Sequence, residues 1–371
     1  MKVKPLKVIK YLIPILFLAL LGIFLAKWSD VKKVDLVSNK SQEFEKAVVT
    51  EVITDNLQED GRKGKVVEAV STNGSLYGAT CYKGLKVVTL TNQSGEVTVT
   101  SVYSLNREPF IYGFIGLFFL LLCIVGGKNG LKAVIGLVIT FILVLLYLFP
   151  AIYRGMSPVN AAVITVILTT IITIFVLTGY TRKSLAAILG TISGVIISGI
   201  AAWLFGKISG ISGYNVSNID NLVSVANCTN IKIGDLLFAG ILISSLGAVM
   251  DVGLSVASTI TEIHDVNPEL NTGELFKRGM NVGKDMMGTM ANTLILAFAG
   301  GSLSELLLDY AYNLPYLQIV NSYTIGIELM RGVAGSIGII LTVPLVSLFA
   351  SVLMKIKFKF IDSPVVSEDT V

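Results

Sequence analysis

Apolar runs separated by short polar segments make up most of the chain. Eight of these runs are close to the ~20 residues that cross a bilayer as an α-helix. They are residues 9–26, 110–126, 133–149, 159–178, 185–205, 236–257, 286–308 and 332–354. The pattern predicts a polytopic α-helical membrane protein with about eight transmembrane helices, so the lipid bilayer is its first expected partner.

The first apolar run follows a basic segment, MKVKPLKVIK, as it would in a signal peptide. No small-residue cleavage site follows it, because the segment IFLAKWSD has bulky residues near its end. We therefore expect residues 1–26 to form a cytoplasmic N-terminal tail and an uncleaved anchor helix.

Lysine and arginine are distributed unevenly between the polar segments. If the chain crosses the membrane eight times, every polar segment that is rich in lysine or arginine falls on the same side. The basic residues of these segments are Lys2, Lys4, Lys7, Lys10, Lys128, Lys132, Arg182, Lys183, Lys277, Arg278, Lys284, Lys355, Lys357 and Lys359. The short segments on the other side hold only Arg154, Lys207 and Lys232. Because basic loops stay in the cytoplasm, both termini are predicted to be cytoplasmic.

Residues 27–109, between the first two runs, then lie outside the membrane. Three stretches in them, KVVEAV, LKVVTL and EVTVTSVYSL, are rich in β-branched residues, and TNGS and NQSGE have turn composition. We expect a small extracytoplasmic β-rich domain, in which residues 27–46 fit either a linker or a first strand. The segment has no histidine and no glycine-rich phosphate loop, so no catalytic site is expected there.

The remaining segments complete the organisation. We expect transmembrane helices 2–5 in residues 110–205 and helices 6–8 in residues 234–356. Residues 206–233, rich in Gly, Ser and Asn, form a second extracytoplasmic loop, and residues 357–371 form a cytoplasmic tail.

Composition agrees with a membrane protein, since 53% of the 371 residues are hydrophobic, 15% are charged and the mean hydropathy is +0.76. Cys81, Cys123 and Cys228 lie far apart, and the single histidine, His264, is expected in a solvated loop. Without a CxxC motif or a His/Cys cluster we expect no metal and no cofactor. A Cys81–Cys228 disulfide outside the membrane and two free thiols both fit the sequence.

Asp251 is an acidic residue inside the apolar run 236–257. If the helix begins near Leu236, Asp251 lies about 6 Å from the inner boundary at ~1.5 Å per residue. A carboxylate at the centre of a spanning helix costs about 2.5–3.5 kcal/mol on insertion scales, and less near the ends. Such residues usually face a bundle interior or a water-filled cavity, so Asp251 is the first candidate for a functional residue.

Small and polar residues recur around Asp251 at steps of three and four, and therefore share one helix face. This stripe consists of Gly240, Ser244, Gly247, Asp251, Ser255, Ser258 and Glu262. The run 286–308 carries a second stripe, formed by Gly288, Asn292, Ala299 and Ser302 and flanked by Thr289 and Thr293. We expect the two stripes to face each other, with Asp251 as an intramembrane proton site. The other candidates for this polar pathway are Glu262, Ser255, Ser258, Thr289, Asn292 and Thr293.

Simpler explanations exist for each of these residues. The stripes also fit helix packing alone, with Asp251 accepting hydrogen bonds from Thr289, Asn292 or Thr293. Glu262 fits an ordinary cytoplasmic residue. Glu328 and Arg331 have i,i+3 spacing and are candidates for an ion pair near the outer boundary.

Four long motifs resemble the YibE/F-like family of bacterial membrane proteins. They are GGKNGLKAVIGLVITFILVLLYLFPAIYRGMSP, GYTRKSLAAILGT, LGAVMDVGLSVASTITEI and GKDMMGTMANTLILAFAG. The resemblance covers residues 110–355. It implies a multi-pass protein of the bacterial plasma membrane and no established activity.

A second resemblance is to the membrane halves of SecD and SecF in the RND superfamily. In those proteins a span-borne Asp precedes a cytoplasmic Glu, and the next helix carries an Asn/Thr run; Asp251, Glu262, Asn292 and Thr293 take those places here. The sequence departs from that pattern around Glu262, has two more spans and has a much smaller outer domain. The resemblance implies proton coupling by an intramembrane acid, and a homodimer or a paralogous membrane partner.

Two functions follow as expectations. The first is a proton-coupled transporter or energy transducer with Asp251 as the proton site. The second is a non-transporting membrane scaffold or assembly factor whose extracytoplasmic domain binds a partner. No enzyme is expected, because HExxH, GxSxG and Ser–Lys motifs are absent, and no nucleic-acid partner is expected.

Overall fold

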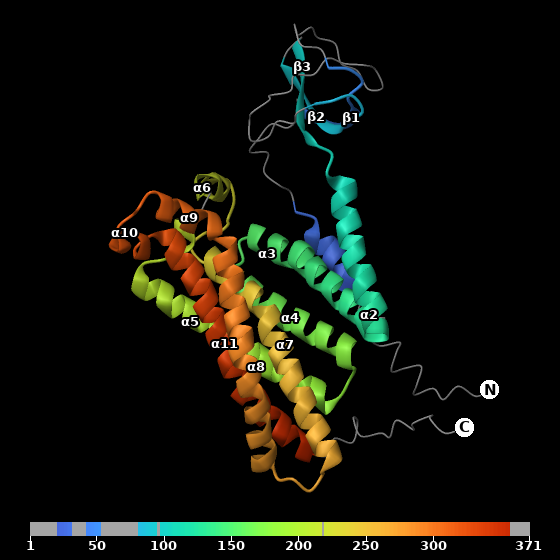
Figure 1. Cartoon of the computed structure of the whole chain (residues 1–371), viewed down its shortest axis with the longest axis vertical. Coiled ribbons are helices and arrows are strands. Elements are labelled where there is room, and N and C mark those ends of the chain that lie inside the picture. The colour runs from blue at the N-terminus through green and yellow to red at the C-terminus, as the bar shows by residue number, and fades with distance from the viewer. Residues whose placement is uncertain (1–20, 32–41, 53–80, 95–96, 217–218, 357–371) are drawn as a thin grey trace, which may run out of the picture. The chain divides into compact units, whose positions relative to one another are not determined.

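The computed structural model describes residues 21–31, 42–52, 81–94, 97–216 and 219–356, and the statements below refer to these ranges. The chain divides into two compact units. Unit 1 comprises Met1–Lys32 and Leu131–Val371, and unit 2 comprises Lys33–Gly130. Figure 1 shows a group of long helices and one small sheet.

Helices account for nearly all of the described part of unit 1. Residues 21–29 are helical. Further helices are α3 (Phe149–Tyr153), α4 (Pro158–Thr178), α5 (Arg182–Ser209), α6 (Ile219–Asn227), α7 (Leu236–Val266), α8 (Thr272–Gly301), α9 (Leu303–Ala311), α10 (Tyr316–Val320) and α11 (Tyr323–Lys355). Helix α2 (Glu108–Leu143) begins in unit 2 and ends in unit 1, where the π-helical turn η2 (Val144–Leu148) continues it.

Helix α2 consists of two helices joined at Gly127, whose φ of 53° and ψ of −130° are not helical. A Cβ placed on Gly130 would overlap the carbonyl oxygen of Leu122. In a straight helix these two residues would be about 12 Å apart. The backbone therefore reverses direction around Gly127, in a conformation that glycine adopts readily. This break lies in the polar segment that separates the two predicted runs.

Five helices in the described ranges are long and apolar enough to cross a membrane: Glu108–Tyr153, α4, α5, α7 and α11. The pair α8 and α9, bent by 60°, would make a sixth. A helical membrane protein is thus confirmed, whereas the predicted count of eight is not. Of the first predicted run, residues 9–20 lie outside the described residues.

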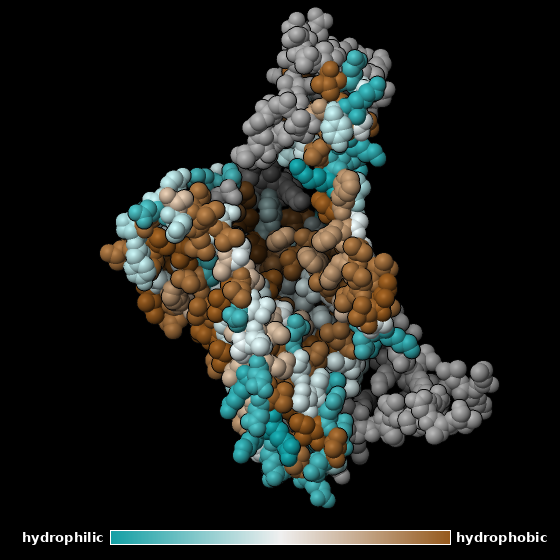
Figure 2. Space-filling model, viewed as in Figure 1, coloured by the Kyte–Doolittle hydropathy of each residue, from teal (hydrophilic) through white to brown (hydrophobic). Residues whose placement is uncertain are grey.

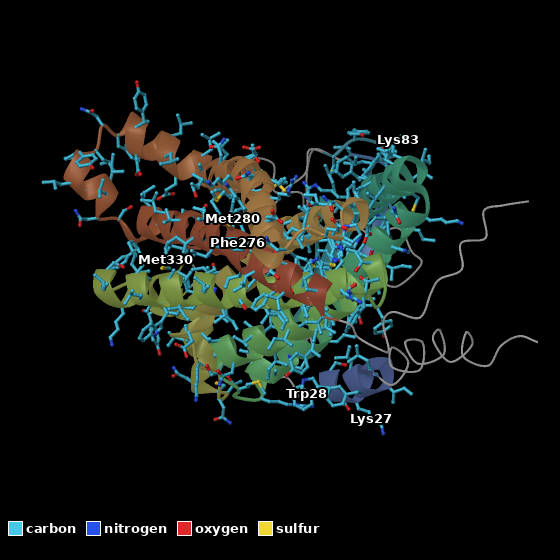
Figure 3. The ribbon with its side chains drawn as sticks, turned by 90° about the horizontal axis from the view of Figure 1, so that it is seen from below. Lys27, Trp28, Lys83, Phe276, Met280 and Met330 are labelled. Carbon is cyan, nitrogen blue, oxygen red and sulfur yellow. The ribbon has the colours of Figure 1, made fainter. Side chains whose placement is uncertain are left out.

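Helix α11 packs against α5, α7 and α8, and α7 packs in addition against α4 and α5. Figure 1 shows α11, α8 and α7 running side by side. Their core is built from branched aliphatic side chains with no more than 2% exposure, among them Val195, Val249, Val252, Val256, Ile339, Val343 and Val346. A second cluster includes Met330 of α11, labelled in Figure 3, with Ala202 of α5 and Ile241 of α7.

Glycines set the distance between α5 and α11. A Cβ on Gly190 would overlap Cγ2 of Val346 and lie 3.1 Å from its Cα. A Cβ on Gly194 would overlap Oγ1 of Thr342, and one on Gly338 would lie 3.0 Å from the carbonyl oxygen of Gly194. Small residues of this kind let two helix backbones approach closely, which strengthens their van der Waals contact in a membrane.

The ends of α5, α7 and α11 are joined by hydrogen bonds to main-chain oxygens. The carbonyl of Met354 accepts one from Nη1 of Arg182 at 2.8 Å and lies 3.1 Å from Nε2 of His264. Nζ of Lys355 donates to the carbonyl of Pro268 at 2.7 Å. The expectation of a solvated loop for His264 is wrong, because this residue is partly buried within α7. Figure 2 shows hydrophilic side chains gathered where α7 turns into α8.

Trp28 holds the helix at residues 21–29 to the rest of unit 1. Its ring stacks on Tyr147 with ring centroids 5.9 Å apart, and the guanidinium carbon of Arg154 lies 4.2 Å from its centroid. Arg154 also donates to the carbonyl of Asp30 at 3.2 Å. Figure 3 labels Trp28 on this helix. Stacking and cation–π contacts of this type each contribute about 0.5–1.5 kcal/mol.

Unit 2 contains an antiparallel sheet of three strands in the order β1 (Gln42–Val48), β2 (Lys86–Ser94) and β3 (Val97–Leu105). Val87 and Val102 are buried on one face. The stretches LKVVTL and EVTVTSVYSL are confirmed as strands, whereas KVVEAV lies outside the described residues. Lys46 of β1 forms an ion pair with Glu108 at the start of α2.

The substitution Gly190→Ala tests the glycine contact between α5 and α11. The added methyl group meets the main chain of Val346, so the two helices must separate, at a cost of about 1–3 kcal/mol. We expect a lower midpoint of thermal unfolding in detergent. In the matched control Gly240→Ala, the new Cβ has nothing within 4 Å, and we expect an unchanged or slightly higher midpoint. Equal effects of the two substitutions would contradict the packing described.

Candidate functional site

Asp251 is the sixteenth of the 31 residues of α7 and so lies at its midpoint. Either end of the helix is about 22 Å away at ~1.5 Å per residue. The helix continues to Val266, well past the end of the predicted apolar run. Asp251 is therefore central in one of the membrane-crossing helices.

The polar stripe of α7 points away from the core of unit 1. Leu242, Val249, Val252 and Val256, on the opposite face, are at most 2% exposed. Gly240, Ser244, Gly247 and Asp251 are exposed, whereas Ser255 and Ser258 are partly buried. A Cβ on Gly240 or Gly247 would meet nothing within 4 Å. From Gly240 to Asp251 the stripe is thus left uncovered by the residues that the structure describes.

The register between α7 and α8 follows from two contacts. A Cβ on Gly279 of α8 would lie 2.5 Å from Cδ1 of Ile260, and one on Gly335 would meet both Leu294 of α8 and Ser245 of α7. The two helices run antiparallel, so a step of nine residues back along α7, from Ile260 to Asp251, corresponds to a step of nine forward along α8, from Gly279 to Gly288. A further step of six on each helix leads to Ser245 and Leu294, which agrees with the contact that both residues make at Gly335. Asp251 is therefore level with Gly288.

Thr289, Asn292 and Thr293 follow Gly288 within about 8 Å along the helix axis. All three are exposed. The hydroxyl of Thr289 donates to the carbonyls of Met286 at 3.0 Å and Asp285 at 3.3 Å, and that of Thr293 donates to the carbonyl of Thr289 at 2.9 Å. The structure brings these three side chains to the height of Asp251, but the hydroxyl protons of the two threonines go to their own helix.

Asp251 makes no hydrogen bond and no ion pair with any residue that the structure describes. Elsewhere on this helix the hydroxyls have main-chain partners, for example Ser244 with the carbonyl of Ile241 at 3.1 Å. Glu262 is exposed and about 16 Å further along α7, too far to share a site with Asp251. The hydroxyls of Ser245, Thr259 and Thr261 also have main-chain partners, whereas the carboxylate at mid-helix has none among the described residues.

Glu328 and Arg331, on α11, show the contrasting arrangement. Oε1 of Glu328 accepts a hydrogen bond from Nη1 of Arg331 at 2.6 Å, and both side chains are partly exposed. The predicted ion pair is confirmed. The charge-assisted hydrogen bond ties the two side chains together one turn apart on α11, so this pair has a structural role.

Buried hydroxyl groups inside the bundle are a feature that the sequence analysis missed. Those of Thr169, Thr170, Thr173, Thr191, Ser198 and Ser347 have no hydrogen-bond partner among the described residues. Thr165, Thr169 and Thr173 recur every four residues on α4, a signal that could have indicated a buried polar face. Such hydroxyls can bond across helices or to the main chain one turn back.

No set of three or more His, Cys, Asp or Glu side chains in the described ranges could hold a metal ion. Cys81, Cys123 and Cys228 form no disulfide bond with one another.

The glycine-packed helices and the acid at the middle of one of them define a multi-pass helical membrane protein. Residues 114–356 match the YibE/F-like protein family, and the chain belongs to that family. The match runs from α2 to the end of α11 and leaves out the sheet of unit 2. No curated protein and no solved structure matches the chain. The resemblance to SecD and SecF is not supported by these comparisons and stays a hypothesis.

The substitution Asp251→Asn should hardly change the stability of the fold, because the carboxylate has no partner to lose in the described structure. We expect a shift in the free energy of unfolding within about 0.5 kcal/mol. Glu328→Gln removes a charge-assisted hydrogen bond on a partly exposed pair and should cost about 1 kcal/mol. Thermal unfolding in detergent compares the two variants. A larger loss for Asp251→Asn would mean that this residue has a structural partner.

Proposed function

We propose that the protein is a proton-coupled transporter or energy transducer of the bacterial plasma membrane, with Asp251 as its proton site. One observation carries the proposal: a carboxylate at the midpoint of a membrane-crossing helix has no counter-ion among the described residues. Unlike Glu328, it has no arginine partner in the described residues. It is therefore able to take up and release a proton.

The exposure of Asp251 supports coupling of protonation to a change of environment. A charged carboxylate costs about 2.5–3.5 kcal/mol at the centre of a bilayer and less toward its boundary, and protonation removes this cost. The ionised form needs water or a polar protein surface instead. The polar face of α7 extends from Asp251 toward one end of the helix through Ser255, Ser258 and Glu262. The neighbouring helix α8 adds the polar side chains of Thr289, Asn292 and Thr293. These residues would form the polar pathway.

We further propose eight transmembrane helices with both termini in the cytoplasm. The chain reversal at Gly127 supports two spans within Glu108–Tyr153, and the helical residues 21–29 support an anchor. Exposed Lys277 and Arg278, near the turn between α7 and α8, fit a cytoplasmic loop. This topology puts the sheet of unit 2 outside the cytoplasm.

Proton flux tests the role of Asp251 directly. The purified protein is reconstituted into liposomes that contain a pH-sensitive dye, and a pH gradient and a membrane potential are imposed. We expect flux above that of empty liposomes for the wild type, and a loss of about tenfold or more for Asp251→Asn, because the amide cannot exchange a proton at this site.

Ser244→Ala is the matched control, since it alters the same face without removing a titratable group. It should keep the flux of the wild type. Equal flux in the wild type and in Asp251→Asn, with both proteins inserted equally, would contradict the proposed proton site.

The uncovered polar stripe favours a second candidate, a membrane scaffold or assembly factor. Small residues without a neighbour, as at Gly240 and Gly247, suit close contact with another helix. A second copy of the chain or a paralogous membrane protein would cover this face. The sheet of unit 2 would then bind the partner outside the membrane.

Deletion of residues 30–105 distinguishes the two candidates. If the protein is a scaffold, partners that co-purify with the full chain should be lost with the deletion, whereas Asp251→Asn should retain them. Affinity purification followed by mass spectrometry measures this. Loss of the same partners in both variants would argue against a role restricted to the outer domain.

A further inference from the structure

An open pocket of about 350 Å³ lies where the end of α5 meets the start of α7. Its walls include Trp203, Lys207, Ser212, Asp235 and Phe238, together with main chain at three glycines. Both helices are long and apolar enough to cross a membrane, and the pocket lies where they end, so we expect it near the bilayer interface. It is separate from Asp251, which is about 22 Å along α7 from Leu236.

The pocket offers one cation and one anion that are not paired with each other. Nζ of Lys207 lies 5.2 Å from the ring centroid of Trp203, and Lys207 has no ion-pair partner in the described part of the chain. Oδ2 of Asp235 accepts a hydrogen bond of 3.3 Å from the hydroxyl of Ser157. Each charged group therefore keeps hydrogen-bonding capacity for a ligand.

Asp235 lines the pocket, and its side chain does not cap its own helix. It occupies the N-cap position of α7, where an aspartate normally accepts a hydrogen bond from the backbone of the first turn. Here its side chain makes no such bond. The carboxylate is thereby available to a donor that enters the pocket.

The main chain around the pocket is held by close contacts. Gly210, at the end of α5, has a φ of 69°, and the N–H of Ile211 donates to the carbonyl of Gly206 at 2.9 Å. A Cβ on Gly213 would overlap the carbonyl of Ile233, and the N–H of Gly213 donates to the carbonyl of Gly234 at 2.8 Å. A pocket built on such a frame is largely formed before a ligand binds, which lowers the cost of binding.

An apolar surface adjoins the pocket on α5. Ile200, Leu204 and Ile208 are 58%, 50% and 78% exposed. Trp203 itself is 50% exposed, with the lysine over its ring. Tryptophan and a lysine with an extended aliphatic stem are the side chains that suit the headgroup level of a membrane. The surface fits acyl chains, and the charged pocket fits a headgroup.

We propose that this pocket binds the headgroup of a zwitterionic phospholipid that bears a primary amine, the chemistry of phosphatidylethanolamine. The phosphate lies toward Lys207, and the ammonium lies toward Asp235. A primary ammonium has three N–H donors for the carboxylate, whereas the trimethylated ammonium of phosphatidylcholine has none. The site therefore selects ethanolamine over choline headgroups.

Lipid binding to the full-length protein in detergent tests the proposal. Phosphatidylethanolamine and phosphatidylcholine with identical acyl chains are titrated, and bound lipid is counted by native mass spectrometry. We expect about fivefold tighter binding of the ethanolamine lipid, on the order of one charge-assisted hydrogen bond. Equal affinity for the two lipids would overturn the proposal without any variant being needed.

Substitutions test which part of the headgroup each of the two charged residues binds. Asp235→Asn should abolish the preference between the lipids, Asp235→Glu should keep it, and Lys207→Gln should weaken both lipids by about fivefold. Asp220→Asn and Lys232→Gln, which change exposed charges outside the pocket, should have no effect. A preference that survives in Asp235→Asn would overturn the assignment.

Soluble O-phosphoethanolamine distinguishes a lipid from a free ligand. The proposal predicts that it competes only weakly, because it lacks the acyl chains that contact the apolar surface of α5. Competition at the affinity of the lipid itself would show that the pocket serves a soluble zwitterion, and would overturn the lipid assignment.

Discussion

The close contact between α5 and α11 is the constraint on which the rest of the bundle depends. Glycines at Gly190, Gly194 and Gly338 bring the two backbones together, and the valines of α7 then fill the space beside them. In lipid there is no hydrophobic drive between helices, so this van der Waals contact has to supply much of the association energy. It leaves α7 with one face fully engaged and the opposite face uncovered.

That division of α7 explains why its polar residues lie where they do. The buried face is mainly aliphatic, with Ser245 as its buried polar residue, and the charged side chain of Asp251 lies on the other side. Asp251 belongs to that side, and nothing in the described chain neutralises it. An uncompensated acid at mid-helix is costly in lipid, so its presence points to a role in which its charge changes or another surface meets it.

Local sequence patterns predicted the helices and strands better than the contacts between them. Periodicity located α4, α5, α7 and α11 and two strands, because membrane spans and alternating strands leave strong local patterns. It placed His264 in a solvated loop, although this residue lies in α7 beside the Met354 carbonyl. It also missed the pocket at Lys207 and Asp235, because those residues are 28 positions apart and only the packing of α5 on α7 brings them together.

The sequence by itself determined that this chain is a multi-pass helical membrane protein, that Asp251 lies within a span and that Glu328 and Arg331 are close enough to pair. Each of these depends on composition or on spacing within one helix. Only the tertiary structure decided which way each helix face points. The two stripes were expected to meet, yet both present exposed residues, because glycine contacts set the rotation of α7 and α8 against α11 and no local pattern records that rotation.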